Sequence, residues 1–192
     1  IKSFVTPETY LKIALFHIHT SDEIVVFSNV NGRTSYANEG NTGRNGVDAS
    51  IDTSLPHHIE LYAAYSFIDA RFQNSKVAGR FLPGVPSSRL YGEADWRDPG
   101  TGFYTRLDGQ WETRLYVDNQ NTAYAPGYFR ADWAGGFRQK LGPLGFNEFL
   151  RVNNIFNRSY IGSVIIADAN QEYYEPAPTR NFIIGATATY RF

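Results

Sequence analysis

Apolar and polar residues alternate with a period of two along most of this chain, and this pattern limits its fold more than any other feature. Ile59, Leu61 and Tyr65 belong to one row, while Glu60 and Ser66 belong to the row between. Because successive side chains of a strand point to opposite faces of a sheet, the pattern predicts strands with one apolar and one polar face. It recurs in residues 47–55, 59–67, 90–96, 103–112, 129–138, 146–152 and 182–192, and less regularly in residues 10–27.

The predicted strands are long. The alternation gives about eight strands of roughly ten residues, whereas strands of soluble proteins average about five or six. A strand that crosses a membrane needs roughly nine to eleven residues. A transmembrane helix is not predicted, because no apolar run reaches about 18 residues. The length therefore favours an all-β, antiparallel transmembrane barrel.

The connections alternate in size. Short connections rich in Pro or Gly lie at residues 55–57, 98–102 and 141–145, with another at 6–9, and the longer segments are residues 28–42, 73–88, 116–127 and 157–179. Outer-membrane barrels have short periplasmic turns and long external loops. We therefore expect the long segments to face the outside of the cell.

Composition excludes several classes of protein. The chain has 18 basic and 19 acidic residues, which gives no support for binding nucleic acid. Cysteine is absent, so disulfides and thiolate metal sites are excluded. Methionine is also absent and no signal peptide is visible, which indicates a mature segment or a fragment.

Two other folds fit the alternation. A soluble β-sandwich also alternates, with its apolar face turned inward. A complete small eight-stranded outer-membrane barrel is the second, with a structural, adhesive or lipid-modifying role, since eight strands can close around side chains. Strand length and loop asymmetry argue against the sandwich, while the small barrel stays open as an alternative.

The C-terminal residues resemble a known signal. Phe192 is the last residue, and Tyr190 is the aromatic residue at the alternate position. This ending resembles the signal read by the outer-membrane barrel-assembly machinery. Thr187 stands where that signal commonly has glycine, and Gly185 lies two residues earlier. An ordinary edge strand is the other interpretation of this segment.

Further stretches, in the same order as in the family, resemble the C-terminal barrel of TonB-dependent receptors. They are YANEG at 36–40 with RNGVD at 44–48, LPGVP at 82–86 with RLY at 89–91, VNNIFNRSY at 152–160, and EPAPTRNF at 175–182. The third is similar to the family's Asn-Leu-Phe-Asp-Xaa-Xaa-Tyr signature, and the fourth to its Pro-Xaa-Arg-Xaa-Phe start of the last strand. Residues 160–164 and 170–176 look closest to receptors for iron–siderophore complexes and for pyrroloquinoline quinone.

The resemblance implies the following. The family's barrel has about 22 strands around an N-terminal plug. Residues 1–192 would be about its last eight strands, with the plug and the earlier strands absent. The parent would be an outer-membrane active transport receptor, not an enzyme, and would need no cofactor. Its partners would be the TonB complex through the plug, the barrel-assembly machinery, outer-membrane lipids, and a small ligand such as a siderophore or a quinone cofactor.

Charged residues of both signs share one row of the alternation, which suits a hydrated lumen where neighbouring strands pair them. We expect mainly structural ion pairs there. The row is Asp48, Asp52, Glu60, Glu93, Asp95, Arg106, Asp108, Glu112, Arg130, Asp132, Arg138 and Arg151. The three tryptophans, Trp96, Trp111 and Trp133, fall on the apolar row, where they would anchor the barrel at a headgroup boundary.

The long loops carry the candidate ligand-binding residues. Aromatic faces cover flat ligands, and guanidinium groups hold carboxylates or catecholates in a bidentate manner. The candidates are Tyr36, Arg44, Tyr116, Asn119, Tyr173, Tyr174, Arg180 and Asn181. Solvated loop residues without a ligand are the other interpretation. His17 and His19 share a strand face, but two imidazoles without a third ligand make a poor metal site, so we expect none.

Overall fold

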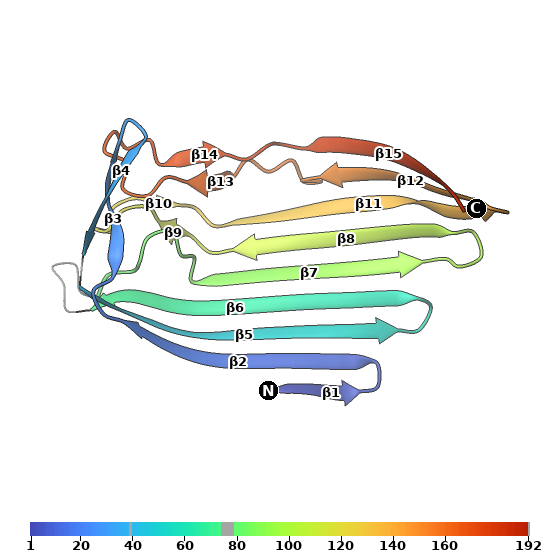
Figure 1. The fold of residues 1–192 in the computed structure, drawn as a ribbon, viewed down its shortest axis with the longest axis horizontal. Helices are drawn as coiled ribbons and strands as arrows, with labels where there is room; N and C mark the ends of the chain where they lie inside the picture. The colour runs from blue at the N-terminus through green and yellow to red at the C-terminus, as the bar shows by residue number, and fades with distance from the viewer. Residues whose placement is uncertain (39, 74–78, 192) are drawn as a thin grey trace.

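The computed structural model describes residues 1–38, 40–73 and 79–191, and within these ranges the regular secondary structure is entirely β. Nine strands form one antiparallel sheet, and Figure 1 shows short turns at one end of it and long loops at the other. Within the same ranges, no helix has the length and apolar character to cross a membrane. In sheet order the strands are β1 (Lys2–Thr6), β2 (Thr9–Thr20), β5 (Asn41–Leu55), β6 (Ile59–Gln73), β7 (Ser88–Arg97), β8 (Phe103–Glu112), β11 (Tyr128–Leu141), β12 (Leu144–Asn153) and β15 (Asn181–Tyr190).

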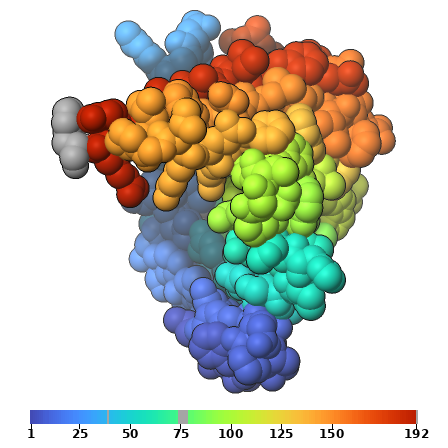
Figure 2. Space-filling view, turned by 90° about the vertical axis from the view of Figure 1, so that its right-hand side faces the viewer, coloured from blue at the N-terminus to red at the C-terminus, as the bar shows by residue number. Residues whose placement is uncertain are grey.

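The sheet is part of a wall and not a closed barrel. Eight of its strands have 10 to 15 residues, and β1 has five, so the prediction of about eight long antiparallel strands is confirmed. Seen from the turn end, the chain follows an arc from blue at the bottom, past cyan and green, to orange and red at the top (Figure 2). A complete small barrel would pair its first and last strands, whereas β1 and β15 are opposite edges of this sheet.

The register places the apolar row on one face of all the long strands. Leu107 of β8, for example, lies between Ala94 of β7 and Trp133 of β11. Side chains of this row are exposed: Leu107 by 48% and Ile184 by 84%. An apolar face of this extent marks contact with lipid or with a partner. This outward face is where the long strands would meet a bilayer.

Aromatic residues border the outward face at both ends. At the turn end, the ring of Phe103 lies 5.9 Å from that of Trp96 and 5.2 Å from that of Phe137. At the loop end, Trp111 pairs with Phe129 across neighbouring strands. Two aromatic girdles around an apolar band are typical of membrane barrels. Trp96, Trp111 and Trp133 all point outward, as the alternation predicts, but Trp133 pairs with Leu107 in the middle of β8 and so lies away from both borders.

Short turns join the strands where the sequence predicts them. In the turn between β7 and β8, Thr101 Oγ1 donates to Asp98 Oδ2 at 2.6 Å, and Gly100 N donates to Asp98 Oδ1 at 3.0 Å. The bond from Thr101 holds the pKa of the Asp98 carboxyl below its usual value. Between β5 and β6, His57 and His58 both adopt positive φ, at 65° and 62°. Phe192 of the predicted assembly signal lies outside the described residues.

The strand-like stretch predicted over residues 10–27 is confirmed for residues 10–20 and 24–27, but it is divided between two strands. β2 ends at Thr20, and a separate hairpin of β3 (Ile24–Val30) and β4 (Arg33–Asn38) follows. The chain bends at residues 21–23, where Asp22 has a φ of 56°. The hairpin turn consists of Asn31 and Gly32, with φ of 51° and 76°. Asn-Gly is the residue pair that favours a two-residue hairpin turn, so the sequence does carry this signal.

Candidate functional site

Ion pairs cover the inward face of the wall, as the alternation predicts. A guanidinium nitrogen of Arg151 lies 2.9 Å from Asp132 and 3.4 Å from Asp108, and Arg130 lies 3.3 Å from Asp132. The side chain of Asp132 is only 2% exposed. A second network consists of Arg106, Glu93 and Asp95, at 3.3 and 2.9 Å. Each buried carboxylate here meets a guanidinium, so the removal of either partner would leave an uncompensated buried charge.

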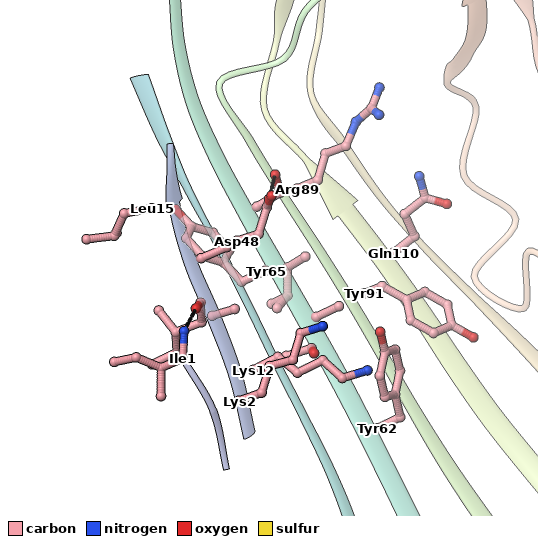
Figure 3. Close-up of a pocket in the computed structure, with 17 residues that line it drawn as sticks. Ile1, Lys2, Lys12, Leu15, Asp48, Tyr62, Tyr65, Arg89, Tyr91 and Gln110 are labelled. Atoms are coloured by element: carbon pink, nitrogen blue, oxygen red, sulfur yellow. Dashed lines mark hydrogen bonds between the residues drawn. The ribbon is translucent and has the colours of Figure 1, made fainter. Parts of the chain in front are cut away.

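The inward face also contains a broad depression. It has a volume of about 940 Å³ and is lined from β1 to β8. Figure 3 shows Lys2 and Lys12 beside the ring of Tyr62, with Tyr91 next to it, and the two tyrosine rings are 6.1 Å apart. Ser66 donates to Asp48 at 2.5 Å on the same surface. It is broad, and charged side chains such as Lys12 and Asp48 line it together with apolar ones, which suits a lumen wall better than an enclosed catalytic pocket.

The long loops meet in one assembly, which we call the loop cap. It comprises the β3–β4 hairpin and residues 79–87, 113–127 and 154–180, with the short strands β9 (Leu115–Tyr116), β10 (Tyr124–Ala125), β13 (Ile161–Val164) and β14 (Tyr174–Pro176). Asn29 N donates to Ala167 O at 2.9 Å, and Ala167 N donates to Val117 O at 2.8 Å. Gly84 N donates to Tyr116 O at 2.8 Å. Backbone bonds therefore join all four segments.

An apolar cluster lies inside the loop cap. Val117 is fully buried between Leu115 and Ala125, and Tyr173 packs against them. Burial raises the pKa of the Tyr173 hydroxyl. A loop that buries side chains of its own is more ordered than a solvated connection. The cap is thus a folded layer over the lumen end of the sheet.

Four of the predicted ligand-binding residues take part in this layer. The ring of Tyr116 stacks on that of Phe81 at 5.7 Å. The Tyr174 hydroxyl donates to Tyr124 O at 3.0 Å, and its ring meets that of Tyr173 edge-on at 5.9 Å. Asn119 Nδ2 donates to Val26 O at 3.0 Å. These contacts are structural, and they leave the Tyr174 ring 42% exposed.

The other four predicted residues are divided between β5, the β3–β4 hairpin and the start of β15, where Arg180 and Asn181 are neighbours in the sequence. Arg44, on β5, forms a two-pronged ion pair with Glu23, at 2.9 and 3.3 Å. Asn181, at the start of β15, accepts a hydrogen bond from Asn153 at 2.7 Å. Tyr36 is 65% exposed on the β3–β4 hairpin, and Arg180 is also exposed. Of this set, only Tyr36 and Arg180 present largely uncovered side chains.

A pocket beneath the loop cap contains residues that the sequence does not single out. It has a volume of about 310 Å³ and lies between the inward face of β8 and the strand β13. Arg89, Gln110 and Tyr128 line it, and Arg89 Nε lies 3.2 Å from Glu112. The ring of Tyr128 lies 4.3 Å from that of Tyr160. Their inward position in the alternation was the available signal, but alternation does not tell which inward residues lie under the loops.

The histidines lie away from this pocket. His17 Nδ1 is 2.6 Å from Asn45 Oδ1 on the outward face of β2 and β5. His57 and His58 lie in a turn at the opposite end of the sheet. Among residues 1–38, 40–73 and 79–191, no group of three or more His, Cys, Asp or Glu side chains is arranged to hold a metal ion.

The sequence of this chain matches a known protein family. The model of the family described as "TonB dependent receptor-like, beta-barrel" matches residues 2–155. The chain belongs to this family. TonB-dependent receptors are transport receptors, and the open wall described above is a portion of their barrel.

Solved receptors share the fold at low sequence identity. The ferric citrate transporter FecA is 18% identical with a TM-score of 0.78, and the match covers 95% of this chain and 29% of FecA. For the ferric yersiniabactin uptake receptor FyuA from Yersinia pestis, the identity is 18%, the TM-score 0.77, and the coverage 98% and 28%. The siderophore receptor PiuA from Acinetobacter baumannii is 18% identical with a TM-score of 0.72, and the match covers 97% of this chain and 26% of PiuA. The chain therefore spans less than a third of the length of each of these three proteins.

Proposed function

We propose that this chain is the C-terminal part of the barrel of an outer-membrane receptor that imports a scarce nutrient, with a ferric siderophore as the ligand class. The match to the TonB-dependent receptor barrel over residues 2–155 carries this proposal. The exposed apolar face with aromatic borders supports an outer-membrane location. The similarity to a ferric citrate transporter, a ferric yersiniabactin uptake receptor and a siderophore receptor supports an iron complex as the cargo.

The ligand chemistry follows from the loop cap and the pocket beneath it. Ferric siderophores and their relatives are bulky and often anionic, so they need aromatic faces and guanidinium groups. Tyr36, Tyr174 and Arg180 are exposed and offer these groups among the residues of the cap. Arg89 and Tyr128 offer them on the inner side, next to the lumen. Tyr116, Tyr173, Asn119, Arg44 and Asn181 would hold these surfaces in position through the contacts described above.

The proposed partners follow from the same assignment. A TonB complex would act through a plug, which would lie against the charged inward face. The barrel-assembly machinery would act through the last strand, where Tyr190 and Phe192 stand. Outer-membrane lipids would cover the outward face. A quinone cofactor is the second ligand candidate, because the tyrosines of the cap also suit a flat anionic ring system.

Growth of a strain that lacks the full-length parent tests the uptake function. The strain would be grown with a ferric siderophore as the sole source of iron. Parallel cultures would depend on added pyrroloquinoline quinone or on added cobalamin. We expect loss of growth on one ferric siderophore and its return when the parent gene is restored. Unchanged uptake of every compound would refute the nutrient assignment.

Binding by variants of the parent tests the site. Arg180→Ala with Tyr174→Ala should weaken binding of that siderophore by about tenfold or more, because arginine and tyrosine are the usual anchors of a binding surface. Arg97→Ala is the matched control, since Arg97 is exposed at the turn end of β7. Wild-type binding by the double variant at normal barrel abundance would refute the site but leave the transporter assignment intact.

A further inference from the structure

A groove lies on the outer side of the wall, at the loop end of β8 and β11. It has a volume of about 640 Å³, and its lining includes Trp111, Phe129, Arg114 and Arg158. Trp111 and Phe129 are the last outward aromatic pair of these two strands. They are 39% and 47% exposed. The floor of the groove is therefore continuous with the apolar outward face.

The rim of the groove is positively charged. Arg114 and Arg158 are both exposed. In the described part of the chain, neither guanidinium lies within 4.0 Å of a carboxylate oxygen. The guanidinium of Arg114 instead lies over the rings of Tyr116 and Tyr124, at 5.7 and 5.5 Å. The groove therefore combines a cationic rim, made of two guanidinium groups without acidic partners, with an apolar floor.

The single carboxylate that lines the groove does not cancel this charge. Glu112 is 9% exposed and makes its ion pair with Arg89, 3.2 Å away on the inward face. The hydroxyls of Ser87 and Thr113 are 3.1 Å apart at the same rim. The groove can therefore supply two cationic groups and further hydrogen-bond donors to an anion.

We propose that this groove binds the phosphorylated headgroup of an anionic lipid of the outer leaflet, with the acyl chains lying over Trp111 and Phe129. The inference rests on the outer-membrane location in the proposed function. Charge complementarity selects the phosphate, since guanidinium groups bind phosphate in a bidentate manner. The apolar floor selects a lipid over a soluble phosphate, because only a lipid also covers exposed aromatic surface. Basic residues beside a membrane-spanning wall bind anionic headgroups in this way.

The test uses the full-length parent, purified in a mild detergent. Lipopolysaccharide with a short sugar chain is titrated against the wild type, against Arg114→Ala/Arg158→Ala, and against the control pair Arg33→Ala/Arg97→Ala. We expect about tenfold weaker binding for the first pair and wild-type binding for the control, a difference that corresponds to the loss of a strong polar contact. Lipid stripped of its phosphates should bind the wild type about as weakly as intact lipid binds the variant.

Three outcomes would overturn the inference. They are equal binding by the Arg114→Ala/Arg158→Ala protein, equal binding of the dephosphorylated lipid, and full competition by inorganic phosphate at the same concentration as the lipid. Siderophore uptake is measured with the same variants. If the wild type takes up no siderophore but lipid binding is still weaker in the Arg114→Ala/Arg158→Ala protein, only the nutrient assignment is refuted. The two proposals can therefore be tested independently.

Discussion

Single residues of the sheet show why it contains glycine within long strands. Several strand glycines lie under aromatic rings, which occupy the space that a larger residue would need. The pairs are Phe16 over Gly46, Trp133 over Gly135, Phe149 over Gly185 and Phe129 over Gly109. Glycine in a strand normally weakens it, but a covering ring restores packing and shields the backbone. These glycines therefore belong to the packing of the wall.

Gly46→Ala tests this interpretation. A Cβ atom there would collide with the ring of Phe16 and with the backbone oxygen of Phe67, and the backbone cannot move aside. Overpacking of this kind costs about 1–3 kcal/mol. The temperature at which the purified barrel unfolds should fall. It is measured by heating samples and following the change in mobility from folded to unfolded protein on a denaturing gel. Gly92→Ala is the matched control, because nothing lies within 4 Å of a Cβ at Gly92. Equal unfolding temperatures for both variants would contradict the packing role.

The ion pair between Glu23 and Arg44 leads to a pH dependence. The hydrogen bond from Arg44 lowers the pKa of the Glu23 carboxyl below its ordinary value of 4.5. A lowered pKa means that the stabilisation is present above that ordinary value and is lost as the pH falls through the folded-state pKa. Amide hydrogen exchange in the β3–β4 hairpin should therefore speed up, after correction for intrinsic rates, as the pH falls below 4.5.

Glu23→Gln provides the control for this effect. The variant should lose about 1–2 kcal/mol of hairpin protection at neutral pH, and its protection should change little on acidification. The same steep dependence on pH in the variant would assign the effect to another group.

At the scale of the strand, the outward and inward rows differ in what they tolerate. Leu107→Arg places a charge in the middle of the apolar face, which costs about 2–4 kcal/mol in a bilayer. The amount of assembled protein in the outer membrane should fall sharply. Asp52→Ala is the control, because Asp52 belongs to the inward row that water reaches. Equal abundance of both variants would count against a lipid-facing wall. Ala131 is less suitable for this test, since it is 5% exposed although it shares the outward row.

The last strand carries a separate prediction about assembly. β15 runs from Asn181 to Tyr190 with the outward row Phe182, Ile184, Ala186 and Ala188. If this row is offered to the barrel-assembly machinery together with Phe192, then Phe192→Ser should lower the assembled fraction several-fold. The measurement is the ratio of surface-labelled receptor to total receptor. Arg191→Ser is the control, because it changes the neighbouring C-terminal residue and keeps Phe192. Unchanged surface levels of the Phe192→Ser protein would refute the signal.

At the scale of the whole molecule, the sequence predicts the wall well and the loop cap poorly. Alternation sorts the two faces of each strand, so the inward ion pairs and outward tryptophans could be predicted. The cap depends on contacts such as Asn119 with Val26, which are 93 residues apart. Nothing local encodes such a pairing, because it depends on which loops the sheet brings together. The pocket residues Arg89 and Tyr128 were missed for the same reason.

The loop cap lies across the route that a ligand would take from outside to the pocket beneath it, and this yields a final prediction. Asn29 and Asp168 are bridge partners that join the β3–β4 hairpin to residues 154–180. These 192 residues contain no cysteine, so a pair introduced at these two positions meets no competing thiol within this part of the receptor. If the hairpin must part from the other loops to admit a bulky ligand, a disulfide there should lower siderophore uptake about tenfold or more, since an entry step that needs an open state cannot be faster than the opening.

Reduction of the disulfide should restore uptake in the same cells, and the Asn29→Ser/Asp168→Ser protein measures what the substitutions alone do. Asp168 is 8% exposed and accepts hydrogen bonds from the backbone of Asn170 and Glu172, so the serine pair also reports any loosening of that turn. Ligand binding at equilibrium should be affected less than uptake, because the bridge blocks passage and leaves the exposed side chains of Tyr36, Tyr174 and Arg180 uncovered. Normal uptake by the fully oxidised protein would show that the ligand passes the cap without separating these loops, and the route would then have to lie along the part of the barrel wall that other strands provide.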